Sequence, residues 1–346
     1  MKLMVPAILA ALLAAFPAAA APGDEIYARP GRLVAASDGA RLNLVCMGKG
    51  GPAVIFDSGF EDWAPAWALV QPRVAEWTTV CGYDRAGTGF STSGPMPRTA
   101  MRIAGELRSA LRKAGIRGPY ILAGHAFGGD NVRAFADLYP ADIAGLVLVD
   151  ADTGDVEPEA LREEDHKVIP DVVASLGACR DLIASGKPLP MLPHRAGRPD
   201  RTCADGYFRG LPEAVWSPAL NAKLLEIAHR RADMIDANIS EFSQMPADED
   251  FLRRHRRFLG RTPVRVITTM HHAVHFFDPK WVPTPEEHRY QQTIAEAQAR
   301  WLTLSSDSRQ IFVKNSSEYV TFDAPDTVAA VIRDVWKQAR ARRRGK

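Results

Sequence analysis

Eight short runs of aliphatic and β-branched residues constrain the fold of this chain more than any other feature. Several are continuous apolar runs bounded by Gly, Pro or Asp, which is typical of strands buried on both faces of a parallel sheet. An amphipathic stretch, Met101–Ala114, lies between two of them, and a similar stretch, Ala324–Arg340, closes the chain. The alternation predicts an α/β fold with a doubly wound sheet. The runs are Leu33–Ala36, Leu42–Cys46, Ala53–Phe56, Thr79–Tyr83, Tyr120–Ala123, Leu146–Val149, Val264–Thr268 and Gln310–Val313.

The segment from Thr153 to about Gly260 interrupts this alternation. It is rich in Pro, Arg and Glu, its pattern is mainly helical, and it contains no clear strand. We therefore predict a helical cap over residues 153–262, lying over one edge of the sheet. The cap divides the sheet domain into a first part, residues 21–152, and a second part, residues 263–346.

The N-terminus has the pattern of a signal peptide. Lys2 precedes the apolar run Leu3–Phe16, small residues follow, and we place the cleavage site after Ala20. The run is short for a membrane span and contains Pro6, so a membrane anchor is the less favoured alternative. We expect a secreted or periplasmic protein that has lost residues 1–20 and is not stably inserted in a membrane.

If the protein is exported, its four cysteines are expected to form disulfides, because disulfides form in oxidising compartments. Cys46, Cys81, Cys179 and Cys203 allow three different pairings. Cys179 and Cys203 both fall inside the predicted cap, which favours a bond between these two. Reduced, buried thiols are the alternative.

One turn of the chain has a chemical signature. The stretch G-H-A-F-G-G, from Gly124 to Gly129, lies between a predicted strand and a predicted helix. It has the shape of a nucleophile elbow, which normally reads G-x-S-x-G. The middle position is Ala126, whose methyl group cannot act as a nucleophile.

Further motifs extend this similarity. They are V-C-G-Y-D-R-A-G-T-G-F-S (Val80–Ser91), P-R-T (Pro97–Thr99), G-P-Y-I-L-A-G-H-A-F-G-G (Gly118–Gly129) and A-G-L-V-L-V-D-A (Ala144–Ala151). In this order they resemble the α/β-hydrolase-fold superfamily, in particular its secreted bacterial serine hydrolases with a lid. The resemblance covers roughly half of the chain and implies a mostly parallel, eight-stranded sheet flanked by helices. It also implies that the strands of Cys46 and Cys81 are neighbours, which favours a disulfide between them.

The resemblance assigns a catalytic triad residue by residue. The nucleophile position is Ala126. The base position falls in S-S-E-Y-V-T-F-D-A-P, Ser316 to Pro325, where Glu318 replaces histidine. The acid position matches Asp150, and Asp278 is a second choice. Two of the three triad members are therefore replaced, and we read both losses as natural.

The oxyanion donors would survive these losses because they are backbone N–H groups. The resemblance places them at Phe127, after the elbow residue, and at Phe60, in the D-S-G-F stretch. Removing serine or base alone costs about a million-fold in rate in a measured case, and removing both costs little more. Ordinary serine hydrolase activity is therefore expected to be absent.

Other residues near the elbow carry side chains that can act as acids or bases. His125 precedes Ala126, and we expect its side chain to point away from the nucleophile's side. Glu318 and Asp150 would lie close together if they occupy the old base and acid positions, and mutual repulsion would raise the pKa of one of them. The alternative, which we favour, is that Glu318 faces solvent or pairs with an arginine of the cap.

A metal site is a further alternative. His271 and His275 are four residues apart, the spacing that puts two ligands on one helix face, and Asp278 could be a third ligand. The neighbouring Phe276 and Phe277 favour an irregular apolar loop instead. We therefore expect no metal and no other cofactor.

The sequence thus predicts an exported, non-catalytic member of this fold. Its expected partner is a small apolar or carbonyl-bearing ligand under the cap, or a protein of unknown identity. The formal net charge of +2 gives no reason to expect nucleic acid. The alternative function is hydrolysis of carboxyl-ester-like substrates by metal- or carboxylate-based chemistry.

Overall fold

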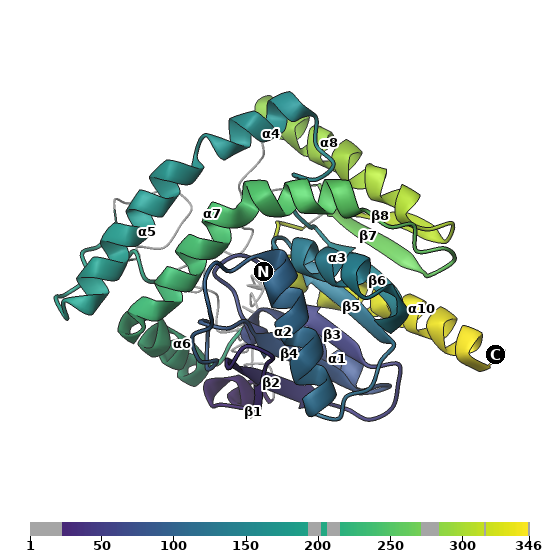
Figure 1. The fold of residues 1–346 in the computed structure, drawn as a ribbon, viewed down its shortest axis with the longest axis horizontal. Helices are drawn as coiled ribbons and strands as arrows, with labels where there is room; N and C mark the ends of the chain where they lie inside the picture. Colours follow the sequence, from purple (N-terminus) through teal and green to yellow (C-terminus); the bar gives the residue numbers. More distant parts are fainter. Residues whose placement is uncertain (1–22, 193–201, 206–214, 271–283, 315, 345–346) are drawn as a thin grey trace, which may run out of the picture.

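The computed structural model describes residues 23–192, 202–205, 215–270, 284–314 and 316–344 (Figure 1). The predicted signal peptide and the triplet His271, His275 and Asp278 therefore lie outside the described residues.

The eight strands form one sheet in the order β1-β2-β4-β3-β5-β6-β7-β8 (Figure 1). The pairs β1–β2 and β2–β4 are antiparallel, whereas all other neighbours are parallel. The predicted mostly parallel, eight-stranded sheet is confirmed. The strands are β1 (Arg32–Ala35), β2 (Arg41–Met47), β3 (Val54–Asp57), β4 (Val80–Asp84), β5 (Tyr120–His125), β6 (Ile143–Val149), β7 (Val264–Thr269) and β8 (Ser308–Val313).

Helices cover both faces of the sheet, and each face has its own apolar core. Val54 and Phe56 of β3 contribute to the core that contains Val328 of α10. Ile55, between them in the strand, contributes to the opposite core with Leu107 of α2, because successive strand residues face opposite sides. The elements of this sheet domain are η1 (Asp24–Ala28), η2 (Ala64–Trp67), α1 (Gln71–Ala75), α2 (Ala100–Lys113), α3 (Gly128–Leu138), η3 (Pro140–Asp142), α8 (Pro285–Ala299), η4 (Arg300–Leu304), α9 (Val320–Asp323) and α10 (Pro325–Arg344).

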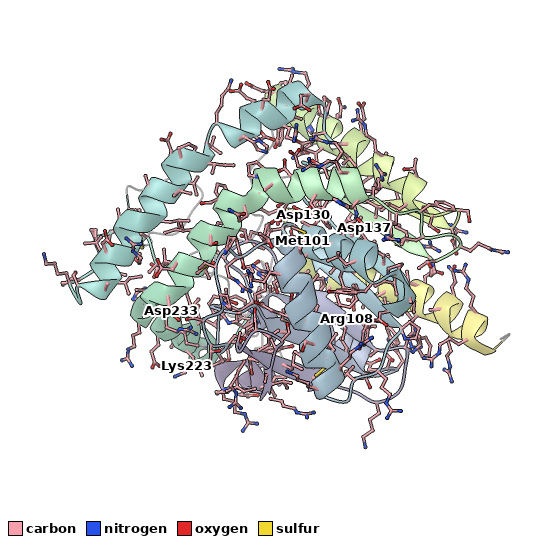
Figure 2. All side chains as sticks on the ribbon, in the orientation of Figure 1. Met101, Arg108, Asp130, Asp137, Lys223 and Asp233 are labelled. Carbon is pink, nitrogen blue, oxygen red and sulfur yellow. A yellow bond between two sulfur atoms is a disulfide. The ribbon has the colours of Figure 1, made fainter. Side chains whose placement is uncertain are left out.

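Local sequence explains the predicted helix α2. Thr99 caps it, since its hydroxyl accepts a hydrogen bond from Arg102 N at 3.2 Å. The apolar face of α2 is buried on the sheet. Arg108 (Figure 2) pairs instead with Asp142 at 2.6 Å, near the chain's turn into β6.

The segment inserted between β6 and β7 is helical and extends to one side of the sheet (Figure 1). It has a small core of its own around Leu176, Cys179 and Ile235. No helix in the described ranges is both long and apolar enough to cross a membrane. The helices of this cap are α4 (Glu159–His166), α5 (Ile169–Ala184), α6 (Pro218–Arg230) and α7 (Ala232–His255).

Both expected disulfides are present. Cys46 and Cys81 face each other across the antiparallel pair β2–β4, with their Cα atoms 4.1 Å apart. Cys179 and Cys203 are joined within the cap, where the bond ties α5 to the chain that precedes α6.

Candidate functional site

The turn between β5 and α3 has the backbone of a nucleophile elbow. Ala126 has φ 46°, in the left-handed region that residues with a side chain rarely adopt. A Cβ on Gly124 would lie 2.3 Å from the carbonyl oxygen of Gly128, and one on Gly128 would lie 2.5 Å from that of Asp57. Only glycine fits these two positions, so the glycines close the turn tightly around an alanine.

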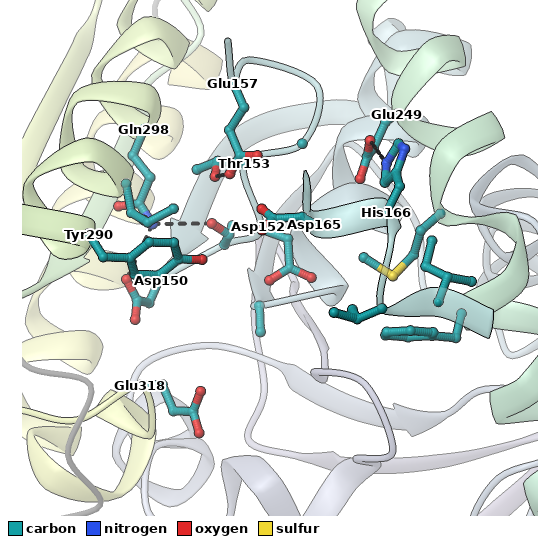
Figure 3. A pocket seen from close by; sticks show the side chains of 18 residues that line it. Asp150, Asp152, Thr153, Glu157, Asp165, His166, Glu249, Tyr290, Gln298 and Glu318 are labelled. Atoms are coloured by element: carbon teal, nitrogen blue, oxygen red, sulfur yellow. Dashed lines mark hydrogen bonds and ion pairs between the residues drawn. The ribbon is translucent and has the colours of Figure 1, made fainter. Parts of the chain in front are cut away.

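Ala126 lines a cavity of about 540 Å³ (Figure 3). Its walls come from the carboxyl edge of the sheet and from α4, α5, α7 and α8. Asp150 and Glu318 line the same cavity. The three residues that the sequence assigned to the triad positions are therefore brought together, although they come from three distant segments.

Asp150 follows β6 and has φ 43°. Its carboxylate accepts a hydrogen bond from the hydroxyl of Thr269 at 2.6 Å. It also accepts one from the side-chain amide of Gln298 at 3.2 Å (Figure 3). Its orientation is thus fixed by β7 and α8. Glu318 is held through its backbone, because its carbonyl oxygen lies 2.7 Å from His125 Nε2.

The cavity is strongly acidic. Six carboxyl groups line it, and Arg and Lys are absent from its described lining. Burial is the main cause that raises the pKa of Asp152 to about 7, and the charges of Glu249 and Asp150 add to it. Burial, with the charge of Glu157, raises the pKa of Glu249 to about 8. The six carboxyl groups belong to Asp150, Asp152, Glu157, Asp165, Glu249 and Glu318.

One histidine of the cap also reaches this cavity. His166 Nε2 lies 2.7 Å from the Glu249 carboxylate, which joins α4 to α7 (Figure 3). Burial, together with the nearby Arg162 charge, lowers the pKa of His166. The cavity therefore contains groups that can exchange protons near neutral pH.

The loop that carries Phe60 is fixed by Arg85. The guanidinium donates to the carbonyl oxygens of Ser58 at 2.7 Å and Gly59 at 2.8 Å. It also forms buried ion pairs with Asp57 at 3.0 Å and with Glu241 of α7 at 2.9 Å. The loop, β4 and the cap are thereby connected.

The two residues assigned as oxyanion donors lie side by side. The rings of Phe60 and Phe127 are in edge contact, with centroids 6.4 Å apart. Gly59 is adjacent to Ala126, because a Cβ built on it would lie 3.4 Å from the Ala126 methyl. The loop and the elbow therefore meet where the resemblance places an oxyanion hole.

The ring of His125 packs beside the loop of Gly59, since Nδ1 lies 3.3 Å from the position that a Cβ on Gly59 would take. The bond from Nε2 to the Glu318 carbonyl turns the ring this way. His125 is absent from the described lining of the cavity, and the expected direction of its ring stays a prediction. No group of three or more His, Cys, Asp or Glu side chains suited to a metal occurs within the described ranges.

Sequence reasoning missed most of the polar lining. Gln298 of α8 and Glu249 of α7 line the cavity, and no motif marks them. The same is true of Thr269 of β7, which holds the lining residue Asp150. Arg85 had a signal, since it stands inside the quoted motif Val80–Ser91. Asp62, two residues after Phe60, was also missed and is 3% exposed.

Comparison with known proteins agrees with this architecture. Residues 52–177 match the family model described as the alpha/beta hydrolase fold. The uncharacterized protein YqjL of Bacillus subtilis is 23% identical over 289 residues, covering 84% of this chain and 85% of the relative.

Solved structures cover more of the fold. Cfl2 of Burkholderia cenocepacia has a TM-score of 0.62 at 19% identity, covering 88% of this chain and 94% of that one. Epoxide hydrolase I of potato (Solanum tuberosum) has a TM-score of 0.60 at 16% identity, covering 88% and 97%. At these identities the likeness establishes the fold.

Proposed function

Because the chain belongs to the α/β-hydrolase-fold superfamily, we propose that it is an exported member that binds a small ligand beneath its cap without serine catalysis. The observation that carries this proposal is Ala126, which stands at the elbow and lines the cavity. A methyl group cannot form the acyl-enzyme on which serine hydrolysis depends.

The cavity restricts the ligand. Phe242, Met245 and Ile294 supply apolar contacts, and backbone N–H groups at Phe60 and Phe127 are suited to a carbonyl oxygen. The carboxyl groups disfavour an anion, since like charges repel in a poorly solvated site. The proposed ligand is therefore small, carries an apolar part and a carbonyl, and is neutral or cationic.

Export is supported by the two disulfides, which persist in oxidising compartments. The N-terminal pattern of residues 1–20 supports it independently. Fractionation of expressing cells, followed by N-terminal sequencing, tests it. Recovery of the uncleaved chain with reduced cysteines in the cytoplasm would count against export.

A fluorophosphonate probe tests the loss of serine chemistry. We expect the wild-type mature protein to remain unlabelled and to hydrolyse none of a broad panel of esters. The variant Ala126→Ser/Glu318→His should gain measurable ester turnover if these are the nucleophile and base positions. Covalent labelling of the wild type would defeat the proposal, and a folded but inert double variant would defeat the assigned positions.

Acid–base hydrolysis without serine is the second candidate. It is favoured by Asp152, whose burial raises its pKa to about 7, where a carboxyl group can exchange protons with a substrate. Turnover by the wild type that is lost in Asp152→Asn would support this candidate. A chelator in the same assay separates carboxylate chemistry from metal chemistry.

A further inference from the structure

Two buried polar atoms beside the elbow have no partner among the described residues. They are Oδ1 of Asp62 and Nδ1 of His125, and each side chain belongs to a residue that is 3% exposed. Buried polar groups in folded proteins nearly always have a hydrogen-bond partner. The Asp62 and His125 side chains can therefore each take one further hydrogen bond.

Both side chains border the same space, Asp62 with Oδ2, the second oxygen of its carboxyl group. A Cβ built on Gly59 would lie 3.2 Å from Asp62 Oδ2, 3.3 Å from His125 Nδ1 and 3.4 Å from the Ala126 methyl. Because residue 59 is glycine, no atom fills the position that these three groups surround. Ala126 also lines the cavity of about 540 Å³, so the space adjoins the proposed binding site through this residue.

The hydrogen-bonding roles at this space are complementary. His125 Nε2 lies 2.7 Å from the Glu318 carbonyl oxygen, which can only accept, so Nε2 carries the proton. Burial lowers the pKa of His125, and this effect outweighs the opposing effects of the Glu318 carbonyl and of Asp150. The ring is therefore neutral, and its unprotonated Nδ1 can accept a hydrogen bond.

Asp62 supplies the matching donor. Burial raises its pKa to about 8, with Arg85 opposing the shift and Glu61 and Glu318 adding to it. At neutral pH the carboxyl group is therefore protonated and can donate. One hydroxyl group can donate to His125 and accept from Asp62 at the same time.

We propose that Asp62 and His125 form a binding site for one hydroxyl group beside the methyl of Ala126. The hydroxyl belongs to the ligand of the proposed function, on which this inference rests, and water takes its place when the cavity is empty. The site adds a requirement to the ligand, which must carry a hydroxyl near the group that reaches the elbow.

A serine at position 126 tests the site, because it adds a hydroxyl to the side chain that borders the space. In Ala126→Ser, with Glu318 unchanged, His125 should accept the serine proton while Oγ forms a bond to phosphorus of a fluorophosphonate and fluoride leaves. We expect covalent labelling by this single variant. Adding His125→Phe should slow labelling by about 100-fold, the lower range of general base catalysis.

A second variant removes the space and keeps both side chains. Gly59 does not have a positive φ, so its backbone tolerates alanine, and the added methyl fills the site. Gly59→Ala in the Ala126→Ser background should reduce labelling as His125→Phe does. Gly105→Ala is the matched control, since its Cβ would meet only the Tyr139 hydroxyl at 3.5 Å.

The outcomes separate this inference from the proposed function. Labelling of Ala126→Ser that persists with His125→Phe and with Gly59→Ala would overturn the hydroxyl site, whereas the wild type would still be unlabelled. Failure of Ala126→Ser to label at all, in a folded protein, would also overturn it. Labelling of the wild type would defeat the proposed function alone.

Crystals of the wild type distinguish the two sources of the hydroxyl. We expect a water between Asp62 and His125 in crystals without alcohol, and its replacement by the alcohol oxygen after soaking in ethanol. A direct Asp62–His125 bond with no third atom would overturn the site. Water that ethanol does not displace would overturn its use by a ligand.

Discussion

Replacing Arg85 should destabilise this protein more than any other arginine substitution that we consider. Its side chain is 2% exposed and pairs with Asp57 and Glu241, both of which are fully buried. Arg85→Ala leaves these two carboxylates without their cation and removes the donors to the Ser58 and Gly59 carbonyls. Breaking a buried ion pair from one side costs about 3–5 kcal/mol of unfolding free energy.

Denaturant unfolding followed by tryptophan fluorescence measures this loss. Arg73→Ala is the matched control, because Arg73 also pairs with an aspartate, Asp326 at 2.6 Å, but with its side chain 38% exposed. Such a surface pair contributes about 0–1 kcal/mol. Equal effects of the two substitutions would refute the argument that burial makes the Arg85 pairs essential.

Arg85→Lys refines the test. Lysine keeps the positive charge but lacks the planar fork that reaches the Phe60 loop and Glu241 together. We expect a loss between those of the two alanine variants. Full stability of Arg85→Lys would show that charge alone is sufficient.

Three further predictions concern the elbow, the cavity and the cap. Ala126→Gly should raise the unfolding free energy by about 0.5–1 kcal/mol, because glycine relieves the left-handed strain but loses more chain entropy on folding. Asp152 and Glu249 have pKa values of about 7 and about 8, above their usual range, so the folded chain binds protons that the unfolded chain has released. Stability should therefore fall as pH rises from 5 through 8, and Asp152→Asn should flatten that slope in pH-dependent melts. Replacing Cys179 and Cys203 by alanine should remove about 2–4 kcal/mol, detected as faster proteolysis within the cap and not in the sheet domain.

The sheet could be predicted from local sequence because its signal is local. A strand such as Tyr120–His125 is buried along its whole length, so nearly every residue in it must be apolar or small. The cysteine pairing Cys46–Cys81 required more, namely that β2 and β4 are neighbours. That information came from the family resemblance and not from the spacing of the cysteines.

The cavity could not be predicted in the same way. Asp152, Asp165 and Glu249 become neighbours only after the cap folds over the sheet, and each alone has the pattern of an ordinary exposed residue of a helix or loop. The pair Arg85–Glu241 connects positions 156 residues apart. Single-sequence patterns contain no information about such contacts, because no local period or motif depends on them.

The geometry of the elbow does not by itself indicate whether chemistry is retained. Gly124 and Gly128 are required because an added Cβ would lie only 2.3 Å and 2.5 Å, respectively, from backbone carbonyl oxygens of the closely packed turn and of β3. Packing of the sheet domain would preserve this turn even if no nucleophile were needed. The evidence for function must therefore come from groups that packing does not require, and the unpartnered atoms of Asp62 and His125 beside Ala126 are such groups.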